Sequence, residues 1–130
     1  MYLDDIKTYL DAMGVSSVSW PIKIGFLPDD TDQCIALFPT GGYPADTLGR
    51  ENSRPTFQLR VRAGRFDFPT AYAKWQECFD LLQDAQHTSG SPALLVGFAY
   101  IQAMQTEPLE QPDDKLRPNF INNFRVLKSR

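Results

Sequence analysis

The stretch TFQLRVRA, residues 56–63, decides the fold of this chain. One set of its side chains is apolar and the other is polar: Phe57, Leu59, Val61 and Ala63 alternate with Gln58, Arg60 and Arg62. Because successive side chains of a β-strand point to opposite faces of a sheet, this alternation predicts a strand whose apolar face lies on a hydrophobic core. Gly64 ends the pattern. We therefore expect a domain built around this strand.

Other apolar segments predict further strands on both sides of residues 56–63. They are residues 22–27, residues 34–38, residues 94–104 and residues 120–127. Each is a short apolar or alternating run bounded by proline, glycine or polar turn residues, which is typical of strands. Two longer segments, residues 40–55 and 105–118, are rich in glycine, proline or acidic residues and are predicted to be loops.

Two segments have the spacing of amphipathic helices. Residues 3–13 place apolar side chains at intervals of three and four, namely Leu3, Ile6, Leu10 and Met13. Residues 68–86 have Pro69 near their start and a broad apolar stripe made of Ala71, Tyr72, Trp75, Phe79 and Leu82. Each helix can lay its apolar stripe on the sheet.

The order of these elements, a helix, strands, a helix and strands again, predicts an α+β fold. We expect a mixed or antiparallel β-sheet with the helices packed on one face. The chain has 130 residues, no internal repeat and no separable linker, so one domain over residues 1–130 is expected.

The charge of the chain argues against a nucleic-acid-binding module. With 13 basic and 16 acidic residues the net charge is −3, whereas a protein that grips phosphates along a duplex usually has a basic surplus. The charge is uneven, because residues 50–65 are rich in arginine and the first fifty residues are rich in aspartate. This pattern fits either solvated faces or complementary patches that meet between identical subunits.

Cysteine usage and the N-terminal sequence suggest a protein made inside a cell. Cys34 and Cys78 lie in apolar runs, as buried free thiols do. Residues 1–5 lack the basic start and apolar stretch of a signal peptide, and no apolar run approaches the ~20 residues that span a bilayer.

No pattern of residues predicts catalysis, a cofactor or a metal ion. The chain has a single histidine, His87, in a loop rich in serine and glycine, and a pair with Cys78 has no supporting charge nearby. Asp29, Asp30 and Asp32 have some likeness to a calcium loop, but they lack its glycine and distal glutamate, so a turn is the preferred reading. Asp113 and Asp114 also fit a turn. We expect no catalytic, cofactor-binding or metal-binding residue.

Three features instead suggest a subunit that contacts copies of itself or a partner. They are the loop of residues 40–55, the arginine-bearing face of the predicted strand 56–63 and the loop of residues 105–118. Long loops on a small rigid sheet commonly reach neighbours, although ordinary variable loops would look the same. The candidate contact residues are Gly41, Gly42, Tyr43, Arg54, Arg60 and Arg62.

Ordered segments along the chain carry a family resemblance: a short N-terminal amphipathic helix, IGFLPD at 24–29, IALFPTGG at 35–42, RPTFQLRVR at 54–62, the helix with Ala71-Tyr72 and RPNFINNFRV at 117–126. In these segments the chain resembles the minor capsid and tail-terminator family of siphophages. Together they span nearly the whole chain.

The resemblance implies a non-enzymatic virion protein that forms a hexameric ring. Such a ring caps the tail tube, stops its polymerisation and offers a surface for head–tail joining. The implied partners are further copies of the chain, the tail tube protein and a head connector or completion protein, with no cofactor, specific nucleic acid or membrane. The implied location is the head–tail junction of the virion, after assembly in the host cytoplasm. The alternatives are another connector or completion protein, a tail-tube subunit and, further off, a small enzyme or nucleic-acid-binding module.

Overall fold

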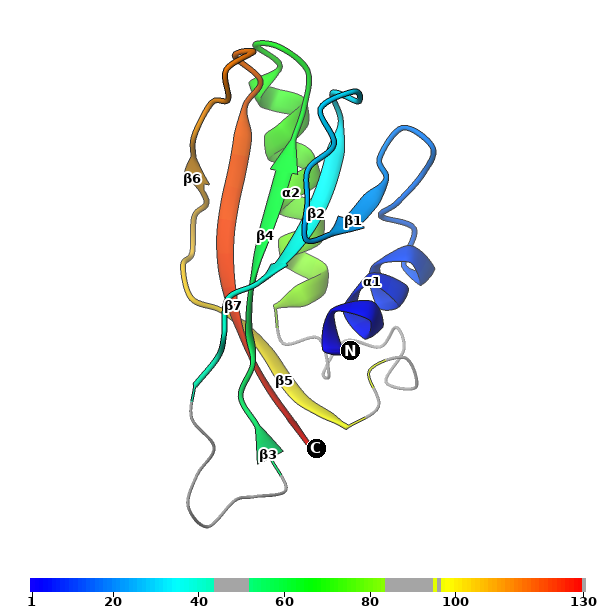
Figure 1. The fold of residues 1–130 in the computed structure, drawn as a ribbon, viewed down its shortest axis with the longest axis vertical. Coiled ribbons are helices and arrows are strands. Elements are labelled where there is room, and N and C mark those ends of the chain that lie inside the picture. The colour runs from blue at the N-terminus through cyan, green and yellow to red at the C-terminus, as the bar shows by residue number, and fades with distance from the viewer. Residues whose placement is uncertain (44–51, 84–94, 96, 130) are drawn as a thin grey trace.

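Strand β4 (Thr56–Arg62) lies in the middle of the sheet, where its alternating sequence places it. The computed structural model describes residues 1–43, 52–83, 95 and 97–129 (Figure 1). The other elements of these residues are α1 (Tyr2–Ala12), β1 (Ile22–Ile24), β2 (Cys34–Pro39), β3 (Asn52–Ser53), α2 (Phe68–Leu82), β5 (Phe98–Ala103), β6 (Leu109–Glu110) and β7 (Asn119–Ser129). The protein is therefore α+β, as expected.

The seven strands form one mixed sheet. β1 runs parallel to β2, and the other pairings are antiparallel. The long strand β7 organises one half of the sheet, because it pairs with β4 along one side and with β5 and β6 along the other. Ile121 shows this directly, since its neighbours are Arg60 of β4 and Leu109 of β6.

Both helices pack on one face of the sheet, and the hydrophobic core lies between the two layers. Strand residues of this face are fully buried, and they include Ile35, Leu37, Phe57, Leu59 and Phe124. On α2 the buried residues are Ala71, Trp75, Cys78 and Leu82. Aromatic contacts join the layers, for example the Tyr72 ring 5.7 Å from the Phe120 ring. The predicted stripe is correct in position, although the Tyr72 and Phe79 side chains are only partly buried.

The helix ends follow local sequence signals. The Asp67 side chain accepts a hydrogen bond from the Thr70 backbone N–H at 3.4 Å, and Pro69 occupies the first turn of α2. These two residues satisfy or remove backbone donors that a helix start leaves without partners. α1 ends at Ala12, and Gly14 follows with a φ of 81°, which a glycine adopts without strain.

The two loops predicted from composition each contain a short strand. β3 lies in the predicted loop 40–55 and β6 in the predicted loop 105–118, and each has two residues paired with β7. The first strand is shorter than predicted, because Gly25 has a φ of 85° and the strand ends at Ile24. β5 begins at Phe98 and β7 extends to Ser129, whereas the predicted helical residues 84–86 and Leu94 lie outside the described residues.

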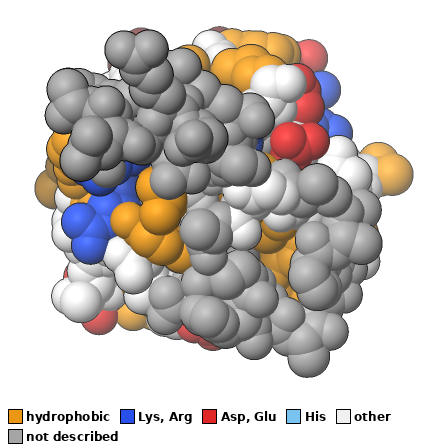
Figure 2. All heavy atoms as spheres, turned by 90° about the horizontal axis from the view of Figure 1, so that it is seen from below, with side chains coloured by type: hydrophobic (Ala, Val, Ile, Leu, Met, Phe, Trp, Pro, Cys, Tyr) orange, Lys and Arg blue, Asp and Glu red, His pale blue; other side chains and the backbone are white. Residues whose placement is uncertain are grey.

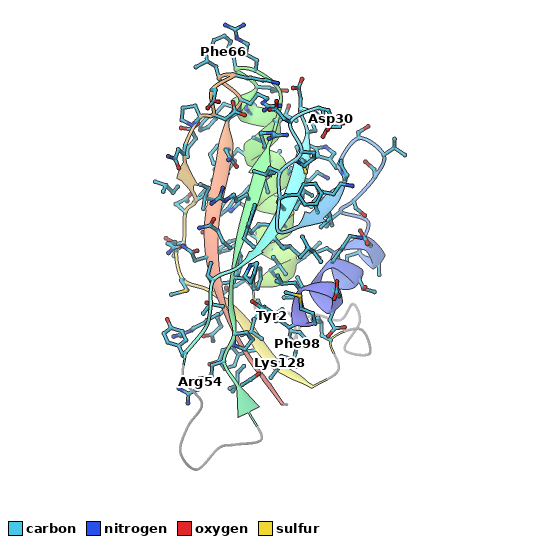
Figure 3. All side chains as sticks on the ribbon, viewed as in Figure 1. Tyr2, Asp30, Arg54, Phe66, Phe98 and Lys128 are labelled. Atoms are coloured by element: carbon cyan, nitrogen blue, oxygen red, sulfur yellow. The ribbon has the colours of Figure 1, made fainter. Side chains whose placement is uncertain are left out.

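The molecule is elongated along the strands, and its two ends differ (Figures 1 and 3). Phe66 and Asp30 lie at the end where α2 begins, and Arg54 and Lys128 lie at the opposite end.

Candidate interaction surface

The chain leaving β2 and the chain entering β4 run side by side, which brings four of the six candidate residues together. Tyr43 and Arg54 form an antiparallel bridge, in which the Tyr43 N–H donates to the Arg54 carbonyl oxygen at 2.8 Å. One step closer to the sheet, the hydroxyl groups of Thr40 and Thr56 are 2.6 Å apart. Gly41 and Gly42 lie between these two contacts.

Glycine is required at position 42 by both conformation and space. Gly41 and Gly42 each have a φ of 97°, in the region that side chains rarely adopt. A Cβ atom on Gly42 would lie 2.6 Å from the Arg54 carbonyl oxygen, which is backbone and cannot give way. The two glycines therefore allow the close approach that positions Tyr43 beside Arg54.

Two hollows flank Tyr43, whose side chain is 47% exposed. One has a volume of about 220 Å³ and is lined by Tyr43, Arg54, Tyr100, Arg125 and Val126. The other has a volume of about 300 Å³ and is lined by Thr40, Gly42, Tyr43, Thr56, Met104 and Asn123.

The Arg125 guanidinium in the first hollow is held in place by Gln102. The Gln102 side-chain oxygen accepts from Arg125 Nε at 3.1 Å and from Nη2 at 2.8 Å. Figure 2 looks on this end of the molecule, where Lys and Arg side chains lie beside hydrophobic ones. The surface around Tyr43 is therefore aromatic and basic.

Arg60 belongs to a different part of the surface. It lies on the face of the sheet opposite the helices, between Ala36 of β2 and Ile121 of β7. Its guanidinium stacks 4.6 Å from the centre of the Phe38 ring, and its Nε donates to the Gln58 side chain at 2.6 Å. Arg60 and Arg54 are six residues apart along a nearly extended chain, which separates them by roughly 20 Å.

Arg62 points to the same face as Arg60 but is enclosed by its own subunit. Its side chain is 4% exposed, although the alternating sequence suggests a solvent-facing residue available to neighbours. Nε donates to the Asp32 carbonyl at 3.1 Å, and Nη2 donates to the carbonyls of Thr31 at 2.6 Å and of Pro28. Burial, together with the charge of Arg117, lowers the pKa of Arg62. Arg62 therefore holds the turn of residues 28–32 on the sheet.

Arg117 is a second buried arginine at this turn, and no local sequence signal indicates it. It is 3% exposed, and its guanidinium pairs with Asp29 and Asp113 at 2.7 Å each and with Asp32 at 3.5 Å. Burial lowers its pKa, but the carboxylates of Asp113 and Asp29 outweigh burial, so the pKa is raised. Asp29 lies 88 residues away in sequence, so only the folded chain creates this site.

Asp29 and Asp32 of the 28–32 turn thus serve an intramolecular ion-pair cluster. Within the described residues there is no group of three or more histidine, cysteine or acidic side chains placed to hold a metal ion. Neither described helix has the length and apolar character to cross a membrane.

The two thiols are poor nucleophiles. Cys34 and Cys78 are both free and buried. Burial raises the pKa of Cys34, and it raises the pKa of Cys78 to about 12. A thiol with such a pKa is protonated near neutral pH and does not act as a thiolate. His87 lies outside the described residues.

Comparison with known proteins gives one family match. No curated protein matches the chain. A family model described as bacteriophage tail terminator protein matches residues 5–115, a span that runs from α1 past β6. The match covers most of the chain and agrees with the resemblance seen in its sequence motifs. The chain therefore belongs to the bacteriophage tail terminator protein family, a family of structural virion components.

Proposed function

We propose that this protein forms a closed ring at the end of the phage tail tube, stops the polymerisation of the tube and provides the surface that joins tail to head. The expected ring has six copies. The protein is then assembled in the host cytoplasm and resides at the head–tail junction. The family match is the observation that carries this proposal.

The fold suits a capping role, because the sheet holds the surface around Tyr43 in a fixed shape at one end of the molecule. The Gly41–Gly42 turn fixes Tyr43 beside Arg54, and Gln102 fixes Arg125 in the adjoining hollow. Held side chains lose little conformational freedom on binding, which favours association. We propose that Gly41, Gly42, Tyr43 and Arg54 contact the tail tube or the head connector.

Arg60 fits a weaker, more peripheral contact on the sheet face. Its guanidinium is partly buried against Phe38 and Gln58, which leaves only part of its hydrogen-bonding capacity for another chain. The proposed role is structural throughout, and it requires no catalytic residue, cofactor, nucleic acid or membrane.

The test is tail length in a phage whose terminator gene is replaced by variants. A phage that lacks the protein should make tubes longer than normal that do not join heads, as seen by electron microscopy. The variant Tyr43→Ala with Arg54→Ala should give the same defect, because it removes two side chains of the proposed contact while the bridge between the two backbones stays. Purified variant protein should keep the far-UV circular dichroism of the wild type.

Lys7→Gln is the matched control. Lys7 pairs with Asp11 at 3.1 Å on the exposed face of α1 and lines neither hollow beside Tyr43, so its loss should leave tail length normal. Tails of normal length and normal head joining without the protein would overturn the proposed function. If a phage that carries the Tyr43→Ala, Arg54→Ala variant makes normal tails while a phage without the protein does not, the assignment of the contact surface is overturned.

A further inference from the structure

An exposed apolar groove lies at the end of the sheet opposite Arg54. It has a volume of about 300 Å³, and five of its six lining residues are apolar: Phe66, Phe68, Pro112, Leu116 and Pro118, with Glu110 as the sixth. Phe66 is 70% exposed, Phe68 is 50% exposed and Leu116 is 43% exposed. Contiguous exposed apolar side chains that line a groove make it a candidate interaction site.

The backbone of the groove is held in an unfavourable conformation. Phe66 and Leu116 each have a φ of 60°, and they are the non-glycine residues of the described chain with a positive φ. The Phe66 N–H donates to the Leu116 carbonyl oxygen at 3.0 Å, so a backbone hydrogen bond joins the two strained residues. Bulky residues rarely adopt this conformation, and such strain persists only where surrounding structure enforces it.

The ion pairs of Arg117 with Asp29, Asp32 and Asp113, which we call the Arg117 cluster, enforce this backbone conformation. The Asp113 carboxylate accepts from the backbone N–H groups of Lys115 and Arg117 at 3.0 and 2.9 Å, and it also pairs with the Arg117 guanidinium. The floor of the groove is tied to the core, because the Phe68 ring packs edge-on against Phe120 at 4.8 Å. The fold therefore presents Phe66 and Leu116 to solvent in a fixed geometry.

A complementary projection lies at a different place on the same chain. Val18 is 103% exposed at the tip of a tight turn, which is closed by reciprocal backbone hydrogen bonds between Ser17 and Trp20 at 3.1 Å. The base of this turn is fixed, since the Trp20 side chain is buried and Lys74 Nζ lies 5.3 Å from the centre of its ring. The turn thus projects one apolar side chain, Val18, from a fixed base, and we call residues 17–20 the knob.

The knob and the groove lie at opposite edges of the sheet. The knob belongs to the connection between α1 and β1, beyond the β1 edge, whereas the groove lies on the side of β6 (Figure 1). Two different surfaces on opposite sides of a subunit can join copies head to tail, and such a contact closes into a ring when the rotation between copies allows it.

We propose that the Val18 turn of one copy docks in the Phe66–Leu116 groove of the next copy, and that this contact closes the terminator ring. The inference rests on the ring of the proposed function. A basic and an acidic side chain border the two surfaces. Arg65, whose guanidinium lies 4.9 Å from the Phe66 ring centre, borders the groove, and Asp11, which bonds Ser16 and pairs with Lys7, borders the knob.

The small apolar area of the groove favours a contact that is repeated around a ring of copies over the same contact in an isolated dimer. With about 200 Å² for a fully exposed phenylalanine side chain, Phe66 and Phe68 together leave about 240 Å² of apolar surface in water. A stable interface buries about 800 Å² on each partner. The groove therefore supplies the apolar centre of a contact, and repetition around a closed ring adds to its stability.

The first test measures ring assembly of the full chain by light scattering over a wide concentration range, with and without tail tubes. Val18→Asp and Leu116→Asn should each raise the concentration needed for assembly at least tenfold. Asparagine tolerates the positive φ at position 116, so this variant keeps the fold while it removes the apolar side chain. Phe26→Ser is the matched control, because Phe26 is 53% exposed and belongs to neither the knob nor the groove, and it should assemble within twofold of the wild type.

The second test uses disulfide cross-linking of assembled rings. The native cysteines are buried, so a Val18→Cys, Leu116→Cys double variant adds the reactive thiols. A ladder of covalent oligomers is expected from the double variant, and monomers are expected from each single variant.

The outcomes separate this inference from the proposed function. If the wild type forms rings and Leu116→Asn assembles normally, the knob-in-groove contact is overturned. Cross-linked dimers from Val18→Cys alone would also overturn it. Either result would leave the proposed function standing. A wild-type protein that forms no ring under any of these conditions would overturn both.

Discussion

The guanidinium of Arg117 and the carboxylate of Asp29 form an ion pair of 2.7 Å across 88 residues of sequence. Arg117 is buried, whereas the Asp29 side chain is 75% exposed. The pair fastens the turn after β1 to the turn before β7. Because Asp113 shares the same guanidinium, this contact also supports the strained Leu116.

Replacement of Arg117 by methionine should lower the free energy of unfolding by about 2–3 kcal/mol, since the buried charge network and its hydrogen bonds are lost. The matched control is Lys115→Met, because Lys115 pairs with the same Asp29 carboxylate at 2.9 Å but is 56% exposed. Its effect should stay within about 0.5 kcal/mol, as for an exposed ion pair. Urea denaturation measures both. Equal effects of the two variants would contradict a special role for Arg117.

The same cluster predicts a loss of stability in acid. Hydrogen bonds from Lys115 and Arg117 lower the pKa of Asp29 below its ordinary value of 3.8. Burial raises the pKa of Asp113, but hydrogen bonds from the Arg117 and Lys115 backbones and the Arg117 side chain outweigh it, so its pKa is also lowered.

A carboxylate with a lowered folded-state pKa contributes stability that is fully present above its unfolded pKa and is lost as the pH falls through the folded value. The free energy of unfolding should therefore fall as the pH is lowered from about 5 through and below the ordinary pKa of 3.8. Denaturation series at several pH values would show a shallower fall for Arg117→Met. The same slope in both proteins would count against the cluster as its source.

Arg62 and Arg60 should respond differently to the same substitution, although they lie two residues apart on one strand face. Arg62→Met removes donors to three backbone carbonyls of the 28–32 turn and should cost about 2–3 kcal/mol of stability. Arg60→Met keeps apolar contact with Phe38 and should cost less than about 1 kcal/mol. Thermal or urea unfolding distinguishes the two. A destabilisation of the Arg60 variant as large as that of the Arg62 variant would be inconsistent with these contacts.

Asn122 is a polar residue on the helix-covered face of β7, directly across from Leu59. It is 0% exposed, and within the described residues neither its amide nitrogen nor its amide oxygen has a hydrogen-bond partner. Since a buried polar group without a partner is costly, Asn122→Leu should raise the free energy of unfolding by about 1 kcal/mol. Asn123→Leu, on the opposite face, serves as the control and should bring no such gain. Destabilisation by Asn122→Leu would show that the amide is satisfied in solution.

Much of the fold follows from sequence periodicity. The alternation in residues 56–63 and the spacing in residues 3–13 and 68–82 depend on the chain's own geometry, so each local pattern predicts its element and its buried face. The glycines at 41 and 42 also act locally, because only glycine fits the backbone there. Part of the motifs that resemble the terminator family lies in these locally determined segments, namely the N-terminal helix, the glycine pair that ends IALFPTGG, most of RPTFQLRVR and the helix with Ala71-Tyr72.

Other features depend on partners far away in the chain. β3 and β6 have two residues each, too few for a recognisable pattern, and they are strands only because β7 supplies hydrogen bonds to them. The alternation of β4 assigns Arg60 and Arg62 to one face but says nothing of what covers that face. The turn of residues 28–32 encloses Arg62 and leaves Arg60 partly open.

The sequence by itself therefore determined the helices, the main strands and the α+β class, because these follow from side-chain periods within short segments. The tertiary structure alone decided which charged residues are buried, how Phe66 and Leu116 come to face solvent side by side, and which strands flank β7. Burial and ion pairing are properties of groups brought together across the chain, and a local pattern holds no information on a partner 88 residues away.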